Sequence, residues 1–342
     1  MANINSFIEE DIKRFKEISF KIGSNIKLVQ AAGGNTSIKS NNSMLIKASG
    51  KWLNQSLNEN IFVEVNLNSI RKKINNNQEG SFDEDILSNN NLRPSIETSF
   101  HALIEYKYVL HVHSTAVISS SIPDNCYNHL KEILGNKILC VPYVRPGFPL
   151  TLEIKKKYLK HKIIILQNHG LIIADDNIEE AYRSLIEVHQ ALENFENNFE
   201  NLNFNENNIN KIGRYSLVKD SNFNIFRSSD KSLHQLFSKS FYPDHVIFLG
   251  PGIQTFYSPD EVEIFLSKLE EEGVSLPPYF IVFNEGLYEI NNVSNAAKEM
   301  IFCFKEVLLQ LNTNNNLRFL TRTEENELLN WDAEKYRQAN SR

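Results

Sequence analysis

Two histidines separated by a single residue, His111 and His113, are the strongest chemical signal in this sequence. If this segment forms a β-strand, the period of two places both imidazoles on one face, where they can reach one ion. A third histidine, His169, stands in the turn sequence Asn168-His169-Gly170 after an apolar run, where packing gives no reason for it. Three histidines with a position left open for water or substrate are typical of a catalytic zinc site. The alternative is that the His-x-His pair consists of satisfied partners inside a sheet.

Glu97 is the second candidate for chemistry. It follows Pro94 and Ser95, and Ser95 is placed to cap a helix, which puts Glu97 in the expected first turn. A glutamate in a first turn usually only complements the helix dipole at the surface. Beside a metal ion, however, the same carboxylate can move a proton on or off carbon.

Two turns rich in glycine and small hydroxyl residues adjoin short expected strands. One contains Gly33-Gly34-Asn35-Thr36-Ser37 and the other contains Ala48-Ser49-Gly50. Backbone N–H groups in such turns can bind an anion. Gly-Gly-Asn is also common as an ordinary turn, so these turns alone do not define a site.

The elements that would position these residues read as an α/β protein. Apolar residues at helical spacing predict an amphipathic helix near residues 5–30, and strands are expected at 108–112 and 163–166. A helix capped near Asn177 should follow the second of these strands. Further along, strands are expected at 246–249 and 279–283, with helices near 259–271 and 293–311.

An asparagine-rich stretch at 197–210 separates the chain into two halves, which we interpret as domains 1–200 and 211–342. The sequence Asn284-Glu285-Gly286 repeats the pattern of Asn168-His169-Gly170 at an offset of about 115 residues, between an apolar strand and a helix in both halves. The second half is therefore either a degenerate repeat, with Glu285 in the place of the histidine, or a chance similarity of strand–turn–helix units.

Composition limits the class of protein. The chain has 342 residues, 41% of them hydrophobic, and a net charge of −6 without a notable basic run, so there is no footprint for nucleic acid or an anionic membrane. Neither a signal peptide nor a membrane-spanning stretch is recognisable. Three widely separated cysteines are expected to be reduced and buried. We therefore expect a cytoplasmic globular protein.

Taken together, the motifs resemble the class II aldolase/adducin family. The resemblance covers roughly residues 8–195 and rests on five motifs in the family's order: Gly34-Asn35-Thr36-Ser37, Ala48-Ser49-Gly50, Pro94-Ser95-Ile96-Glu97, His111-Val112-His113-Ser114 and Asn168-His169-Gly170. The family includes L-fuculose-phosphate aldolase, rhamnulose-1-phosphate aldolase, L-ribulose-5-phosphate 4-epimerase, related decarboxylases and adducin-type proteins without known catalysis. It implies a central, mostly antiparallel sheet covered by helices, and a homotetramer; residues 211–342 would form a smaller α/β extension.

The resemblance also implies roles for individual residues. His111, His113 and His169 would hold Zn²⁺ or another divalent cation, and Glu97 would be the catalytic acid or base. Gly34, Asn35, Ser49, Gly50 and Ser95 would bind the phosphate of a small sugar-phosphate substrate. Ile96 stands where several members of the family have a second serine, which weakens the expectation of phosphate.

The expected activity is that of a metal-dependent aldehyde-lyase. Cleavage of a carbon–carbon bond beside a hydroxyl group places negative charge on oxygen, which a divalent cation stabilises as a Lewis acid. A 4-epimerase would use the same retro-aldol chemistry, and a scaffold of adducin type would use none. Retention of all three histidines argues against the scaffold.

Overall fold

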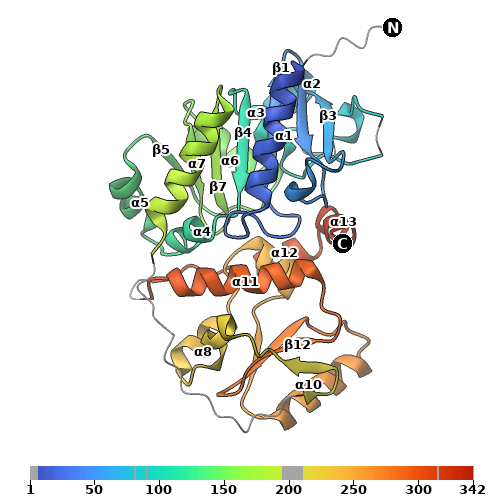
Figure 1. Ribbon diagram of the computed structural model, residues 1–342, viewed down its shortest axis with the longest axis vertical. Coiled ribbons are helices and arrows are strands. Elements are labelled where there is room, and N and C mark those ends of the chain that lie inside the picture. Colours follow the sequence, from blue (N-terminus) through green and yellow to red (C-terminus); the bar gives the residue numbers. More distant parts are fainter. Residues whose placement is uncertain (1–6, 81, 90, 195–210, 314–315, 342) are drawn as a thin grey trace.

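The computed structural model describes residues 7–80, 82–89, 91–194, 211–313 and 316–341. These residues form two α/β units, a larger one that contains the first half of the chain and a smaller one that contains most of the second half (Figure 1). Helix α11 (Asn295–Gln310) lies between the two sheets and packs against α4 (Thr115–Ser121) of the larger unit.

The larger unit is built on a seven-stranded sheet. Its strands are β1 (Asn35–Ser40), β2 (Ser43–Lys47), β3 (Phe62–Asn66), β4 (Tyr108–Val112), β5 (Ile138–Val141), β6 (Ile163–Leu166) and β7 (Gly170–Asp175). They lie in the order β3-β2-β1-β4-β7-β6-β5, and every neighbouring pair is antiparallel except β5 and β6. The predicted mostly antiparallel sheet is therefore confirmed.

Helices cover both faces of this sheet. They are α1 (Glu9–Gly23), α2 (Leu67–Asn75), α3 (Thr98–Leu103), α4, α5 (Cys126–Leu134), α6 (Phe148–Lys157) and α7 (Ile178–Leu192), with 3₁₀ turns at Leu53–Gln55 and Asp83–Asp85. Strand β4 shows how the layers form, because its side chains alternate: Leu110 and Val112 enter the core shared with α1 and α7, whereas Val109 enters the core shared with α3 and α6.

The smaller unit is built on a five-stranded sheet. Its strands are β8 (Lys211–Ile212), β9 (Tyr215–Leu217), β10 (Gln254–Phe256), β11 (Tyr279–Val282) and β12 (Gly286–Ile290). Its helices are α8 (Lys231–Phe237), α9 (Pro243–Leu249), α10 (Pro259–Glu271), α11, α12 (Arg322–Leu329) and α13 (Asp332–Asn340), with a 3₁₀ segment at Ser221–Arg227. Helices α12 and α13 lie at the junction with the larger unit (Figure 1).

The two sheets share one strand arrangement. In the larger sheet, β5 is parallel to β6, and the pairs β6–β7, β7–β4 and β4–β1 that follow are antiparallel. In the smaller sheet, β10 is parallel to β11, and the pairs β11–β12, β12–β9 and β9–β8 that follow are antiparallel. Both β6–β7 and β11–β12 turn through an asparagine with positive φ, 54° at Asn168 and 62° at Asn284. A degenerate repeat in the second half stays a prediction, with chance similarity of strand–turn–helix units as its alternative. The domain division stays a prediction, and the asparagine-rich stretch at 197–210 lies outside the described residues.

Three expectations for local structure were wrong. The N-terminal helix covers only Glu9–Gly23, and Ile8, which lies within the expected helix of residues 5–30, is 68% exposed. Residues 246–249 belong to helix α9 rather than to a strand. The helix expected from Pro94 begins at Thr98, so Ser95 does not cap it and Glu97 precedes its first turn.

All three cysteines are free and buried, as expected. Within the described ranges, no helix combines the length and the apolar character that a membrane crossing requires.

Candidate metal centre

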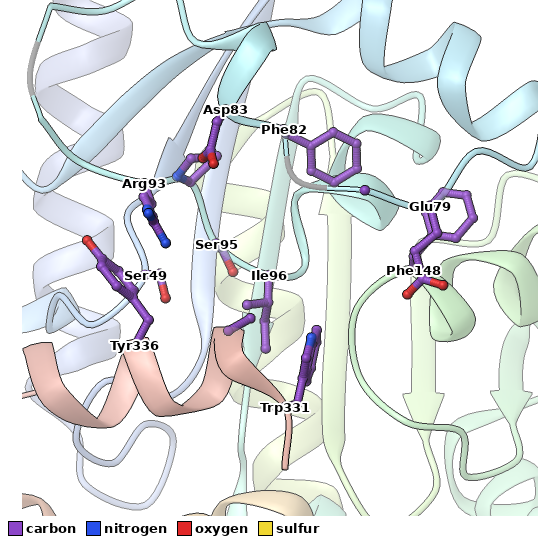
Figure 2. Close-up of a pocket in the computed structure, with 13 residues that line it drawn as sticks. Ser49, Glu79, Phe82, Asp83, Arg93, Ser95, Ile96, Phe148, Trp331 and Tyr336 are labelled. Atoms are coloured by element: carbon purple, nitrogen blue, oxygen red, sulfur yellow. The ribbon is translucent and has the colours of Figure 1, made fainter. Parts of the chain in front are cut away.

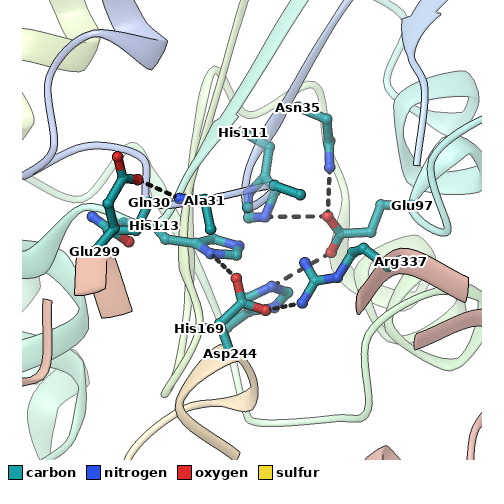
Figure 3. A network of polar contacts seen from close by, with 12 residues as sticks. Gln30, Ala31, Asn35, Glu97, His111, His113, His169, Asp244, Glu299 and Arg337 are labelled. Atoms are coloured by element: carbon teal, nitrogen blue, oxygen red, sulfur yellow. Dashed lines mark hydrogen bonds and ion pairs between the residues drawn. The ribbon is translucent and has the colours of Figure 1, made fainter. Parts of the chain in front are cut away.

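The three histidines predicted as metal ligands lie together at one end of the larger sheet (Figure 3). His111 is in strand β4, His113 lies one residue beyond its end, and His169 occupies the turn between β6 and β7. Each is buried and offers one ring nitrogen, and the offered atoms all lie within 4.8 Å of one another. Sequence reasoning thus found the whole histidine cluster.

Strand pairing explains why distant residues meet here. Strand β4 pairs with β7, with Val112 opposite Leu171, so the β6–β7 turn lies beside the end of β4. Gly170 makes this close approach possible, because a Cβ at that position would lie 2.3 Å from the carbonyl oxygen of Val112. The turn conformation at Asn168 then places His169 toward the other two rings.

The histidine cluster fits a divalent cation. The Nδ1 atom of His111 lies 3.1 Å from the Leu171 carbonyl oxygen, to which it can donate, leaving Nε2 for an ion. His111 Nε2, His113 Nε2 and His169 Nδ1 are buried, with no hydrogen-bond partner among the described residues. Burial lowers the pKa of His111 to about 4 and that of His169 to about 3. Neutral imidazoles with free lone pairs are the form that binds a metal.

Glu97 reaches the histidine cluster from the segment before α3. Its Oε2 lies 3.3 Å from His111 Nε2 and its Oε1 lies 3.5 Å from His169 Nε2. Asn35 Nδ2 donates to Glu97 Oε2 at 2.8 Å, and the backbone N–H of Glu97 donates to Ser95 Oγ at 3.2 Å. These contacts draw Glu97 into the site, which explains why Ser95 and Glu97 do not form the expected helical turn.

The orientation of Asn35 is fixed from its other side. Its Oδ1 lies 2.5 Å from His101 Nε2, and burial keeps the pKa of His101 well below its usual value. A neutral His101 that donates to Oδ1 turns the amide NH₂ group toward Glu97. Burial alone would raise the pKa of Glu97, but His111, His169 and His113, together with the Asn35 hydrogen bond, bring it below the usual value. The carboxylate is therefore ionised at neutral pH.

A cavity of about 320 Å³ is lined by Ser95 and Ile96, the two residues that precede Glu97 in the chain (Figure 2). Ser49, Ser95 and Ile96 line it from the larger unit, and Trp331 and Tyr336 line it from the C-terminal segment. The Ser49 and Ser95 segments are held side by side, because Ser49 N donates to Arg93 O at 2.9 Å and Ser95 N donates to Lys47 O at 3.1 Å. The Ser49 hydroxyl is buried, with no partner in the described part of the chain.

Of the five residues expected to bind phosphate, Ser49 and Ser95 line this cavity, whereas Gly34, Asn35 and Gly50 do not. Asn35 contacts Glu97, whereas Gly34 packs against the backbone of His111 and Gly50 against Asn340 of α13. Lys47 ties the turns together: its buried Nζ donates to Ala32 O and to Lys51 O, both at 2.7 Å. Burial lowers the pKa of Lys47 to about 7.

Asp244 of the second half contacts the histidine cluster and Arg337 contacts Asp244; sequence reasoning missed both residues. Asp244 of α9 places Oδ2 3.0 Å from His113 Nδ1, and Arg337 of α13 pairs with Asp244 Oδ1 (Figure 3). Burial would raise the pKa of Asp244, but Arg337 and His113 hold it far below its usual range. No motif or spacing in the sequence links these residues to the histidines.

Comparison with known proteins identifies the family. The Class II Aldolase and Adducin N-terminal domain family matches residues 21–195, which span the three histidines and Glu97. This chain belongs to that family.

Individual relatives cover part of this relationship. The chain is 32% identical to the uncharacterized oxidoreductase YuxG of Bacillus subtilis (strain 168), over 57% of this chain and 30% of YuxG. It is 26% identical to the 3-oxo-tetronate 4-phosphate decarboxylase of Haemophilus influenzae, over 30% of this chain and 56% of the decarboxylase. The chain thus spans about a third to a half of the lengths of these relatives.

Among solved structures, one similar chain is the N-terminal class II aldolase domain of a conserved protein from Thermoplasma acidophilum. It is 25% identical, with a TM-score of 0.48, over 54% of this chain and 93% of that chain. Another is an L-fuculose 1-phosphate aldolase, 16% identical with a TM-score of 0.41, over 54% of this chain and 84% of that chain.

Proposed function

We propose that this protein is a metal-dependent aldehyde-lyase that cleaves or forms a carbon–carbon bond in a small sugar phosphate. The observation that carries the proposal is the convergence of three buried imidazoles and one ionised carboxylate, in a chain whose residues just before that carboxylate, Ser95 and Ile96, line a cavity. A divalent cation bound by His111, His113 and His169 would stabilise negative charge on a substrate oxygen.

Glu97 would move the proton in this reaction. Its carboxylate is ionised and accepts a hydrogen bond from Asn35. Both carboxylate oxygens lie near the histidine cluster, Oε2 near His111 and Oε1 near His169. A fixed carboxylate beside the reacting carbon can accept a proton when a nucleophile is generated and return it when the bond has broken. Glu97 and the three histidines are all buried, and their burial excludes bulk water from the proton transfer.

The cavity is the proposed binding site for the phosphate end of the substrate. Ser49 lines it, and the buried Ser49 hydroxyl has no partner in the described part of the chain. Ser95, which also lines the cavity, connects it to Asn35 through a 3.1 Å hydrogen bond. Arg93 adds a positive charge at its edge; its guanidinium carbon lies 4.6 Å from the centre of the Tyr336 ring, and no carboxylate pairs with it among the described residues. Arg93 would thus supply a phosphate contact in place of the serine hydroxyl that several members of the family have at the position of Ile96.

Reaction products test this proposal. The protein would be loaded with Zn²⁺ and incubated with dihydroxyacetone phosphate and a panel of aldehydes, and separately with sugar phosphates, with products followed by mass spectrometry. We expect a new carbon–carbon adduct in the first case and free aldehyde in the second. Turnover should be lost in Glu97→Gln and kept in Glu105→Gln, since Glu105 is exposed and pairs only with Lys160 in the described structure.

Other products would identify a different member of the same chemical class. An isomer without free aldehyde would indicate a 4-epimerase, and CO₂ from a 3-oxo acid phosphate would indicate a decarboxylase like the relative from Haemophilus influenzae. A protein that binds metal and converts none of these compounds would contradict the enzyme assignment and favour a scaffold. The remaining parts of the proposal are Zn²⁺ as the native ion, a cytoplasmic location and a homotetramer.

A further inference from the structure

Each metal-binding imidazole needs its second nitrogen held in place. A ligand histidine normally donates its other ring N–H to a carbonyl or carboxylate, which fixes the tautomer and the direction of the ring. His111 has such a partner within the larger unit, the Leu171 carbonyl oxygen at 3.1 Å. For His113 the facing group comes from the smaller unit: its Nδ1 lies 3.0 Å from Asp244 Oδ2, a buried carboxylate oxygen that has no hydrogen-bond partner among the described residues.

Asp244 is itself held firmly. It is buried, and its Oδ1 pairs with Arg337 of α13. Arg337 in turn contacts the buried carboxylate of Glu334, with 2.7 Å between Nε and Oε2. The carboxylate that faces His113 is therefore the end of a buried chain of charged groups, and Figure 3 shows Asp244 between His113 and Arg337.

The larger unit leaves room for this contact at Gly33. A Cβ at that position would lie 2.9 Å from both Asp244 Oδ2 and His113 Nδ1, so any other residue would crowd the pair. A second contact holds the same turn to the smaller unit, because Ala31 N donates to Glu299 Oε2 of α11 at 2.6 Å. The turn at 31–33 thus contacts the smaller unit twice, at Gly33 beside the His113–Asp244 pair and at Ala31.

We propose that Asp244 is a positioning residue of the metal centre, which orients His113 as a ligand while Arg337 fixes the carboxylate. The second half of the chain therefore completes the centre instead of only covering it. This inference rests on the proposed metal site. It names a residue that neither the histidine motif nor the matched family region contains, since the match ends at residue 195.

Metal affinity tests this role without an activity assay. Zn²⁺ and Co²⁺ affinities would be measured by competition with a chromophoric chelator for the unaltered protein, Asp244→Asn and Asp85→Asn, with folding checked by circular dichroism. Asp85→Asn is the matched control, because Asp85 is also a buried aspartate in an ion pair but its partner is Lys73, at 2.7 Å, outside the buried charge chain. We expect about 10- to 100-fold weaker binding for Asp244→Asn and less than about threefold change for the control.

The outcomes separate the inference from the metal site. Equal affinities in Asp244→Asn and the unaltered protein would overturn the positioning role alone, as would equal weakening by the control. Complete loss of metal in folded Asp244→Asn would make Asp244 a direct ligand and also overturn it. Failure of the unaltered protein to bind either ion would overturn the metal centre. If Asp244→Asn does not fold, Asp244→Glu keeps the charge that Arg337 requires but displaces the carboxylate, and it should show weakened binding together with an altered Co²⁺ absorption spectrum.

Discussion

Replacing Glu97 with glutamine removes the proposed proton acceptor with little change of shape. The glutamine side-chain oxygen can still accept from Asn35 Nδ2, which lies 2.8 Å from the carboxylate. The three histidines remain, and their ring nitrogens are the metal-binding atoms. The amide cannot take a proton from carbon, so the variant separates metal binding from proton transfer.

The expected loss follows from the state of the carboxylate. Its lowered pKa means that the unaltered protein already has the ionised base at neutral pH, so the full benefit of general base catalysis is lost. Such catalysis contributes about 10²- to 10⁴-fold, which is about 3 to 5 kcal/mol in the activation free energy. The same lowered pKa means that ionised Glu97 stabilises the fold at pH values above 4.5, and this contribution is lost as the pH falls below that value. The glutamine variant should lack this pH-dependent term.

Exchange of a carbon-bound proton of dihydroxyacetone phosphate for deuterium in D₂O, followed by NMR, isolates this step. We expect Glu97→Gln to retain its metal and to exchange at least about 100 times more slowly than the unaltered protein. Glu105→Gln serves as the control and should exchange at the normal rate. Near-normal exchange in metal-loaded Glu97→Gln would refute the role of Glu97 as the base.

Two further predictions concern the substrate and stability. Arg93→Met should raise KM for a phosphorylated substrate about tenfold and leave kcat nearly unchanged, as measured by steady-state kinetics; an unchanged KM would remove Arg93 from the phosphate site. His245 is buried against Phe304, and burial lowers its pKa to about 3, compared with 6.5 in the unfolded chain. As the pH falls, the unfolded chain therefore binds a proton at this histidine before the folded chain does. The stability of the fold should consequently decrease as the pH drops from 6.5 toward 3. His245→Phe should lose less stability in urea unfolding between pH 7 and pH 4, and parallel pH profiles would contradict this.

Local patterns in the sequence were sufficient for much of the larger unit. The strands expected at 108–112 and 163–166 coincide with β4 and β6, since both are short runs of mostly apolar residues bounded by polar ones. The cap expected near Asn177 is also confirmed, with the Asn177 side chain accepting from Glu179 N and Glu180 N. These features depend on neighbouring residues and can therefore be read from them.

Apolar runs without clear periodicity were ambiguous. Residues 246–249 are consecutive apolar residues, which a buried strand and a buried helix share. Pro243 at the start and Gly250 with a φ of 94° at the end limit the run to the short helix α9. This helix contains Asp244, so the wrong prediction of a strand at 246–249 gave no indication that Asp244 lies at the metal centre.

The features of the site that the sequence did not predict depend on tertiary contacts. Glu97 leaves the expected helical turn because Asn35, from strand β1, holds its carboxylate at the histidine cluster. Asp244 and Arg337 reach that cluster only because the smaller unit packs against the larger one, and their sequence neighbours give no sign of it. A family resemblance limited to the first half could not reveal contributions from the second half.

The metal content of variants altered in the two matching hairpin turns tests the central claim most directly. His169 and Glu285 each follow an asparagine with positive φ in matching hairpins, but Glu285 accepts from Tyr288 OH at 2.5 Å instead of joining the histidine cluster. Elemental analysis of the purified proteins should find about one Zn²⁺ per chain in the unaltered protein and in Glu285→Gln, and nearly none in His169→Ala. Full metal content in folded His169→Ala, or loss of metal in folded Glu285→Gln, would contradict the account.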